Sequence, residues 1–408
     1  MTLSWSALLP AAGDYRDATP PGSPSLVDAL PLGHGLSLSV VADGDAGLHV
    51  VPLVAESRAG AGDGAAEGLV ALLAEGDAAI GKFRVRAWHG VAVSGERAVT
   101  VDQTNESVIV GDAAVVKWMT QVPEGRHPAP SLLEHLEAAG FTGMPQPWGV
   151  VEWSPSPEAE PRLLATVAEY VADAVDGWTW AVEDVRAGTA GGGEAVGRLV
   201  ADFHRALAPT ARPAAAEEVA AWRTGAVADL ERAIEVTEGA AGDLLVRHAD
   251  AVRAAFAEIP ESGLVMRVHG DLHVGQVLRA GGAASYDYRL TDFDGNPVVA
   301  PAERIREQPA ALDVAGMAQS FTHAGIVTRK HNPDLDPVAV TAAAEAGRAA
   351  FLDAYRAGLG DAGALLDERL LRPFALRQVC REFTYAATHL PRWSYVPEAA
   401  LLMALEES

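Results

Sequence analysis

The chain has 408 residues, and 31 basic against 55 acidic residues give it a formal net charge of −24. Such an acidic chain argues against general nucleic-acid binding, which needs Lys and Arg to displace counterions, and against docking on anionic membranes. The length allows two or three domains, and a hydrophobic content of 49% excludes a disordered chain. The single cysteine, Cys380, excludes an intramolecular disulfide.

The amino-terminal segment is apolar, but no basic residue precedes the apolar stretch, as a secretory signal would require. No segment approaches an uncharged apolar span of about 20 residues, the length of a transmembrane helix. We therefore expect a cytoplasmic protein without a membrane segment, and a monomer.

Residues 1–95 are predicted to form a small β-rich cap. Leu36, Leu38 and Val40 alternate with polar or small residues, a turn follows at 43–47, and residues 49–53 return as a strand. This pattern is typical of a β-hairpin with a loop longer than two residues. Residues 67–76 are expected to form a short helix.

Residues 96–175 are predicted to form a second subdomain, a small sheet with one helix. Ser131 is expected to cap this helix, with Glu134 at its third position and Gly140 at its end. The strand-like segments are 97–101, 107–110, 114–118, 150–153 and 163–170.

Residues 176–408 are predicted to form a mostly helical lobe. The exception is 263–298, where short strands alternate with turns and polar residues gather. The predicted fold class is therefore α+β. The helical patterns run through 178–187, 194–207, 216–238, 242–258, 340–358 and 366–390.

The polar residues of 263–298 follow two apolar strands. The first strand ends in His269-Gly270-Asp271, with Gln276 five residues later, and the second ends in Asp292-Phe293-Asp294. A hairpin can place both strand ends side by side. Phosphoryl transfer needs such parts, because one carboxylate orients the attacking hydroxyl while oxygen ligands hold Mg²⁺ against the nucleotide phosphates.

The spacing His-Gly-Asp, four residues, Gln, and then Asp-Phe-Asp 21 residues after the first Asp resembles the aminoglycoside phosphotransferase branch of the protein-kinase-like superfamily. This resemblance implies a bilobal kinase-like fold, ATP between the lobes, Asp271 as the catalytic base, and Gln276 and Asp292 as Mg²⁺ ligands. Asp294 is either a further metal ligand or a contact to the acceptor. Gln276 departs from the family, which has asparagine there.

His269 and His273 also allow a metallohydrolase interpretation. Such a site wants further His or Cys ligands nearby, and none follows at a recognisable spacing. We favour His269 as a packed, hydrogen-bonded structural residue.

Kinase-like folds use a strand lysine that contacts the α- and β-phosphates and pairs with a helix glutamate. Only three lysines occur: Lys82 in a strand-like segment, Lys117 in a strand, and Lys330 in an expected loop. Lys117 alone is followed soon by an acidic helix, so we predict that it pairs with Glu134. The alternative for Glu134 is a simple interaction with the helix dipole.

The family resemblance also implies a hinge at Glu169-Tyr170-Val171, whose backbone reads adenine. No glycine-rich phosphate loop is found; the segment 102–107 stands in its place, and Ser107 is the candidate phosphate contact there.

The predicted helix at 366–390 carries a polar face, because i, i+3 and i+4 positions share one side of a helix. Its members are Gln378, Arg381, Glu382, Tyr385 and His389. The alternative is an ordinary solvated face. Trp393, which follows, could stack on a sugar ring.

The sequence resembles bacterial maltokinases over nearly its whole length, and Gln378-Val379-Cys380-Arg381-Glu382-Phe383 with Trp393 resembles the actinobacterial glucosamine kinases, a related group. This resemblance implies ATP-dependent phosphorylation of glucosamine at its 6-hydroxyl. Gln378, Arg381, Glu382 and Trp393 would hold the sugar, with Glu382 meeting the ammonium and Arg381 orienting Glu382. Maltose, or an aminoglycoside, is the alternative acceptor, and a pseudokinase is disfavoured because Lys117, Asp271 and Asp292 are present.

Overall fold

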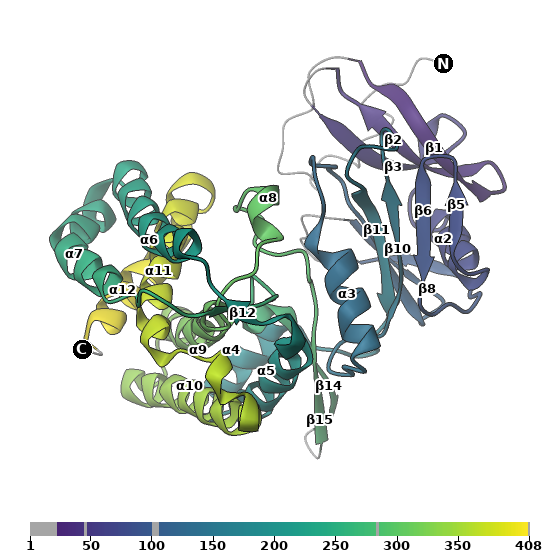
Figure 1. Cartoon of the computed structure of the whole chain (residues 1–408). Coiled ribbons are helices and arrows are strands. Elements are labelled where there is room, and N and C mark those ends of the chain that lie inside the picture. The colour runs from purple at the N-terminus through teal and green to yellow at the C-terminus, as the bar shows by residue number, and fades with distance from the viewer. Residues whose placement is uncertain (1–22, 45–46, 100–105, 283–284, 407–408) are drawn as a thin grey trace. The chain divides into compact units, whose positions relative to one another are not determined.

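A computed structural model describes residues 23–44, 47–99, 106–282 and 285–406. The chain divides into two compact units (Figure 1). The first unit comprises Met1–Glu137, Pro145–Ala172 and Pro297–Ile305, and the second comprises Ala138–Met144, Asp173–Asn296 and Arg306–Ser408.

The described part of the first unit contains two antiparallel sheets. A four-stranded sheet has the order β1-β2-β3-β4, and its β2–β3 hairpin confirms the pattern predicted for residues 36–53. A seven-stranded sheet has the order β5-β6-β10-β11-β9-β8-β7. The strands are β1 Ser25–Gly33, β2 Leu36–Ala42, β3 Leu48–Val54, β4 Ser57–Arg58, β5 Ala78–Ile80, β6 Phe83–Ala87, β7 Glu96–Ala98, β8 Glu106–Val110, β9 Ala114–Trp118, β10 Pro147–Trp153 and β11 Arg162–Glu169.

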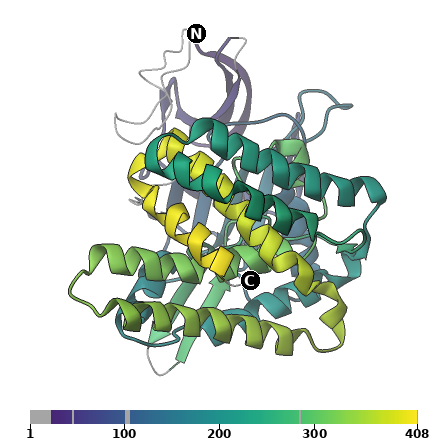
Figure 2. The same cartoon turned by 90° about the vertical axis from the view of Figure 1, so that its left-hand side faces the viewer.

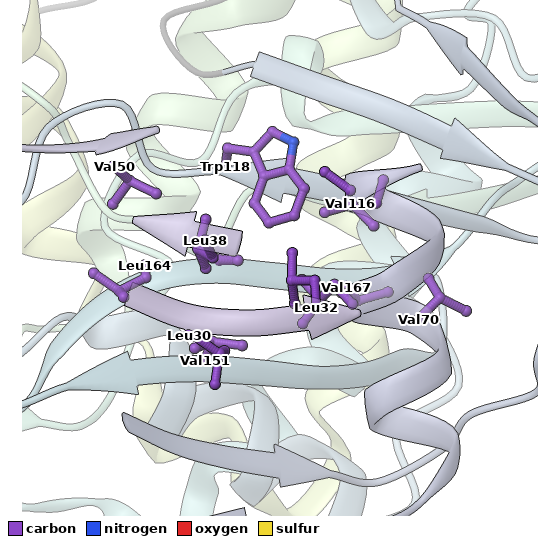
Figure 3. Close-up of a cluster of buried hydrophobic side chains, with 14 of the residues drawn as sticks. Leu30, Leu32, Leu38, Val50, Val70, Val116, Trp118, Val151, Leu164 and Val167 are labelled. Atoms are coloured by element: carbon purple, nitrogen blue, oxygen red, sulfur yellow. The ribbon is translucent and has the colours of Figure 1, made fainter. Parts of the chain in front are cut away.

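One hydrophobic core is shared by both sheets (Figure 3). Leu30 and Leu38 of the small sheet lie in the same cluster as Val116, Trp118 and Val151 of the large one. β-branched and aromatic residues supply most of these strand positions, as expected for a pleated buried surface. Strands β5 and β6, from the predicted cap, belong to the large sheet. The division into three subdomains at residues 95 and 175 stays a prediction.

Two helices belong mainly to this unit, α2 Ala65–Ala74 and α3 Pro128–Ala138. The prediction that Ser131 caps α3 is wrong, because the helix begins three residues earlier. Proline is tolerated in a first helical turn, where its missing N–H has no intrahelical partner, so Pro128 and Pro130 lie inside the helix. Gly140 follows the helix end with a φ of 70°, as predicted for a terminating glycine.

The second unit is mostly helical (Figure 2). Several of its helices contribute to one apolar core. The structure confirms the predicted helices within a few residues. They are α4 Gly177–Arg186, α5 Gly193–Leu207, α6 Ala216–Val236, α7 Gly239–Ala257, α10 Pro337–Leu359 and α11 Leu371–His389. The shorter elements are β12 Arg212–Pro213, β13 Leu264–Val265, the 3₁₀ turn η2 Val274–Gln276, β14 Val277–Gly282 and β15 Ser285–Leu290, while α8 Pro301–Arg304 belongs to the first unit.

Two long helices of the second unit were not predicted, α9 Ala311–His331 and α12 Tyr395–Glu406, and neither was the short helix α8. Buried residues occur on all sides of α9, so its sequence lacks the 3.6-residue alternation of a half-exposed helix. Lys330 therefore lies in the last turn of α9 and not in a loop, and Lys82 lies in a turn between β5 and β6. None of the helices in the described ranges is long and apolar enough to cross a membrane.

Candidate active site

The segment 269–276, which we call the catalytic loop, is anchored by Asp313 of α9. The carboxylate of Asp313 accepts hydrogen bonds from the backbone N–H groups of His269, at 2.7 Å, and Gly270, at 2.9 Å. Farther along the loop, the N–H of Val274 donates to the hydroxyl of Ser320, also on α9. The loop that carries Asp271 is thus tied to one buried helix at two places.

Asp313 is buried and ionised. Burial alone would raise its pKa, but the hydrogen bond from His204 and the backbone donors outweigh it, so the pKa of Asp313 is lowered. His204 Nε2 lies 3.1 Å from Asp313 Oδ2, and its Nδ1 lies 2.7 Å from the hydroxyl of Tyr355. An ionised acceptor makes stronger hydrogen bonds to the loop than a neutral one.

His269 holds the catalytic loop to the end of β15. Its Nε2 donates to the carbonyl oxygen of Thr291 at 2.9 Å, and its ring is almost fully buried against Phe203 and Phe293. With Nε2 used as a donor to a main-chain carbonyl, His269 has the packed structural position predicted for it.

Asp271 has the surroundings of a general base. Its Oδ1 accepts a hydrogen bond from the Asn296 side chain at 2.8 Å. Burial, with smaller contributions from the carboxylates of Asp292 and Asp313, raises the pKa of Asp271 to about 6, although His269 and Arg381 act in the opposite direction. A base is most useful when its pKa lies near the working pH. Asn296 was not predicted; nothing in Asp294-Gly295-Asn296 marks it as a partner of Asp271.

The hairpin lies between other strands than the sequence suggested, because β13, before His269, pairs with β12, whereas β14, after Gln276, pairs with β15. In the β14–β15 hairpin Val277 pairs with Leu290, and the N–H of Thr291 donates to the carbonyl of Gln276 at 2.9 Å. Gln276 and Asp292 therefore flank the same end of the hairpin. Asp292 has a φ of 62°, in the left-handed region that few non-glycine residues adopt and that is often found at functional sites.

This donor set fits Mg²⁺ held against a nucleotide. Carboxylate and amide oxygens are ligands that Mg²⁺ prefers, and it usually takes only one or two carboxylates together with phosphates and water. No three His, Cys, Asp or Glu side chains in the described ranges come together as a metal site of their own. The assignments of Gln276, Asp292 and Asp294 to the metal stay predictions.

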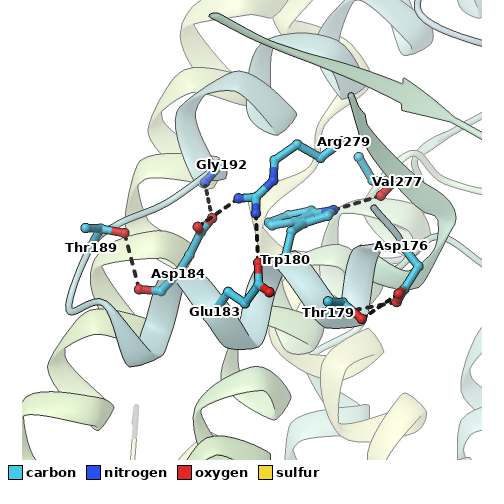
Figure 4. A network of polar contacts seen from close by, with 9 residues as sticks. All are labelled: Asp176, Thr179, Trp180, Glu183, Asp184, Thr189, Gly192, Val277 and Arg279. Atoms are coloured by element: carbon cyan, nitrogen blue, oxygen red, sulfur yellow. Dashed lines mark hydrogen bonds and ion pairs between the residues drawn. The ribbon is translucent and has the colours of Figure 1, made fainter. Parts of the chain in front are cut away.

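Helix α4 packs against the end of the catalytic loop and against β14, and its contacts with β14 are drawn in Figure 4. The indole N–H of Trp180 donates to the carbonyl of Val277 at 2.8 Å, and the buried guanidinium of Arg279 forms ion pairs with Asp184, at 2.8 Å, and Glu183, at 3.2 Å. At the start of α4, a Cβ on Gly177 would lie 1.5 Å from the carbonyl oxygen of Val274, so only glycine fits there. These contacts fix the strand that follows Gln276.

His273 has no features of a metal ligand. Its Nδ1 accepts a hydrogen bond from the N–H of Gly275 at 3.0 Å, and the indole of Trp178 stacks on its ring with the ring centroids 5.7 Å apart. Burial lowers its pKa to about 4, with His269 adding to the effect. The Nδ1 of His273 is engaged by the Gly275 N–H, and no three His, Cys, Asp or Glu side chains in the described ranges are placed to hold a metal, so the structure gives the metallohydrolase alternative no support.

The polar face of α11 divides into two halves. Gln378 donates to Glu382 Oε1 at 3.2 Å in the partly buried half, whereas Tyr385 and His389 are exposed. Glu382 Oε2 lies 3.2 Å from Nε2 of His323, a buried residue of α9. Trp393 is half-buried and packs against the core of this unit.

The expected contact between Arg381 and Glu382 is wrong. The Nε atom of Arg381 donates to Asp229 Oδ2 of α6 at 2.9 Å, and Arg377 donates to the same oxygen at 2.7 Å. Residues three and four positions apart meet on a helix, but adjacent residues point apart, so Arg381 reaches α6 instead of its neighbour.

Two relatives with curated functions match nearly the whole chain. The glucosamine kinase of Mycolicibacterium smegmatis is 45% identical, and the match covers 93% of this chain and 98% of the relative. The glucosamine kinase of Streptacidiphilus jiangxiensis is 42% identical over 100% and 99% of the two chains. This chain belongs to the glucosamine kinase family.

Solved structures agree with this family. A glucosamine kinase in complex with glucosamine, ADP and inorganic phosphate has a TM-score of 0.81 at 40% identity, covering 99% of each chain, and another crystal form scores 0.82. No model of a known protein family matches. The predicted family, the α+β fold of these kinases and the assignment as an ATP-dependent sugar kinase are confirmed.

The first unit holds the residues predicted for the nucleotide. Lys117 of β9 pairs across the sheet with Thr166 of β11 and with Ser107 of β8. Glu134 is more than half exposed and accepts a hydrogen bond from Arg86 at 2.9 Å. The pairing of Lys117 with Glu134 stays a prediction.

The predicted hinge begins where β11 ends. The N–H of Glu169 donates to the carbonyl of Gln146 at 2.8 Å, and the N–H of Gln146 donates to the carboxylate of Glu169 at 3.1 Å. Val171 follows within two residues and is half-buried. Of the predicted phosphate segment, residues 102–105 lie outside the described residues.

Proposed function

We propose that this chain transfers the γ-phosphoryl group of ATP to the 6-hydroxyl of D-glucosamine. The carrying observation is the catalytic loop itself: Asp271, with a pKa near 6, lies in the loop that is bonded to the hairpin end bearing Gln276 and Asp292. The 40% identical structure with glucosamine, ADP and inorganic phosphate supports both substrates.

In the proposed reaction Asp271 accepts the proton of the 6-hydroxyl while the hydroxyl oxygen forms a bond to the γ-phosphorus. The bond from that phosphorus to the bridging oxygen breaks, and ADP leaves with the electron pair. Gln276 and Asp292 would hold Mg²⁺, with Asp294 as a further ligand or a sugar contact. When bound, the metal supplies positive charge to the phosphates. Asn296 keeps the Asp271 carboxylate directed by its hydrogen bond.

The remaining assignments concern binding. Lys117, supported by Glu134, and Ser107 are proposed to contact the phosphates, and the backbone of Glu169 and Val171 to read adenine. Because the reaction consumes ATP, we propose that the enzyme works in the cytoplasm. We also propose that it is a monomer.

The acceptor is proposed to lie against α11. Glu382 offers a carboxylate to the ammonium of glucosamine, Gln378 and Arg381 supply donors for sugar oxygens, and Trp393 an apolar ring face. A neutral sugar has less use for a partly buried carboxylate, since burying a charge without a cationic partner is unfavourable.

The test is ADP release from purified protein with ATP and Mg²⁺, using glucosamine, glucose, maltose and an aminoglycoside as acceptors and a reaction without sugar as background. We expect glucosamine to give the highest kcat/KM, and NMR of the product to place the phosphate on the 6-oxygen. Faster turnover of maltose, with phosphate on its anomeric oxygen, would assign the chain to the maltokinase reaction instead.

A further inference from the structure

We propose that His323 of α9 and Glu382 of α11 form a pair of hydrogen-bond acceptors that together bind the ammonium group of the sugar. This inference rests on the proposed function, and it adds a specificity-determining residue that lies 59 positions before Glu382 in the sequence. It begins from an unusual contact between two groups in the described part of the second unit.

The carboxylate of Glu382 is only half satisfied. Its Oε1 accepts a hydrogen bond from Gln378, but its Oε2 is buried and forms no hydrogen bond in the structure. Buried polar atoms are nearly always hydrogen-bonded, so each exception calls for an explanation such as a ligand. Nε2 of His323 lies 3.2 Å from this oxygen without the geometry of a hydrogen bond.

Gln319 explains why His323 does not donate to Glu382. The side-chain amide nitrogen of Gln319, one helical turn earlier on α9, lies 3.2 Å from His323 Nε2. An amide NH₂ group can only donate, so Nε2 is the acceptor in that hydrogen bond and carries no proton. Both side chains are buried, at 7% exposure for Gln319 and 6% for His323, which holds this arrangement in place.

Two acceptors therefore face one another across 3.2 Å, the lone pair of His323 Nε2 and the open lone pair of Glu382 Oε2. A neutral hydroxyl has one proton and can satisfy only one of them. An ammonium has three donors and a positive charge, so it can satisfy both at once. This difference favours an amino sugar over its hydroxyl analogue.

The position of the pair agrees with a role at the acceptor site. His323 lies on α9, three residues after Ser320. The same helix, α9, bonds the loop through Asp313 and Ser320. The acceptor pair and the catalytic loop are therefore parts of one packed region of the second unit.

The experiment compares kcat/KM for glucosamine and glucose in wild type and in His323→Leu, which keeps an apolar side chain but has no acceptor. We expect the glucosamine value to fall about ten- to a hundredfold, the range of one charge-assisted hydrogen bond, and the glucose value to change by less than about threefold. The matched control is His331→Leu, which removes an exposed histidine from the same helix and should leave both values unchanged.

Equal losses for both sugars would overturn the inference, because they would make His323 a residue of general structure or catalysis. His323→Gln, which can present an amide oxygen, should recover most of the glucosamine preference. A measurement on the wild-type enzyme avoids the question of whether a variant folds. The N-trimethylated sugar keeps the positive charge of glucosamine but has none of its three N–H donors. If the wild-type enzyme phosphorylated it as readily as glucosamine, the inference would also be overturned. If wild type does not phosphorylate glucosamine at all, the proposed function fails instead.

Discussion

Asp271→Asn is expected to make the protein more stable and almost inactive. The carboxylate is largely buried, and burial is the main reason that its pKa is raised from 3.8 to about 6. A buried acid with a raised pKa binds its proton more tightly in the folded state than in the unfolded one. Keeping it ionised at neutral pH therefore opposes folding, and an uncharged amide of the same shape removes that cost.

The size of the effect follows from the two pKa values. They differ by about two pH units, and each unit corresponds to about 1.4 kcal/mol, so the gain in unfolding free energy above pH 7 is about 3 kcal/mol at most. The hydrogen bond from Asn296 can be kept by the amide oxygen. The same substitution removes the group that takes the proton of the acceptor, which should lower turnover by a factor of about 10²–10⁴.

The assay is thermal unfolding of wild type and variant, without nucleotide, at several pH values between 4 and 8. The pH dependence has a definite sign. The variant should unfold several degrees higher than wild type at pH 8, and the difference should shrink as the pH falls through 6. It should be small near pH 4, where wild-type Asp271 is protonated in the folded state and about half protonated in the unfolded state. Asp250→Asn, at a side chain that is 99% exposed, is the matched control and should show no such trend.

Three outcomes would refute this reasoning. A variant that unfolds at lower temperature than wild type at pH 8 would mean that the ionised carboxylate makes contacts worth more than its burial costs. Near-normal turnover in a folded variant would remove Asp271 from the chemistry. A wild-type kcat/KM that stays constant below pH 6 would contradict its role as a base, since the protonated acid cannot accept the proton.

Three further predictions address the other assignments. Asp292→Ala should abolish activity, and excess EDTA should do the same to wild type; full activity in EDTA would exclude an essential metal. Lys117→Ala should raise the apparent KM for ATP and lower kcat, whereas Lys82→Ala and Lys330→Ala should match wild type in the same titration; an equal loss for Lys82 would move the phosphate contact to the turn between β5 and β6. Glu382→Gln should reduce the glucosamine-to-glucose ratio of kcat/KM by about ten- to a hundredfold, and an unchanged ratio would mean that another group, such as Asp294, reads the nitrogen.

Local patterns predicted much of the fold. The alternation Leu36, Leu38, Val40 identified a hairpin, and the strand before Asp292 was also identified. The apolar run before His269 forms only the two-residue strand β13, which pairs with β12. Hairpins depend on residues that are close together in the sequence, as the registers of β2–β3 and β14–β15 show.

The sequence did not predict α9 or the residues that it contributes. A helix buried on all sides has no polar stripe, so Asp313, Ser320 and His323 stood in a stretch without periodicity. Their partners lie more than 40 positions away, and such contacts depend on packing. The same limit explains the error at Arg381, whose partner Asp229 is 152 positions earlier.

The burial of α9 has a consequence for redesigning the acceptor. Asp313 and Ser320 of this helix bond to the catalytic loop, and His323 lies on the same helix. A substitution that shifts the backbone of α9 to admit another sugar would therefore also displace the loop. Helix α11 is more tolerant, because Gln378 and Glu382 are only partly buried and bond mainly to each other. Libraries that aim at new sugars should therefore vary positions 378 and 382 and leave the residues of α9 unchanged.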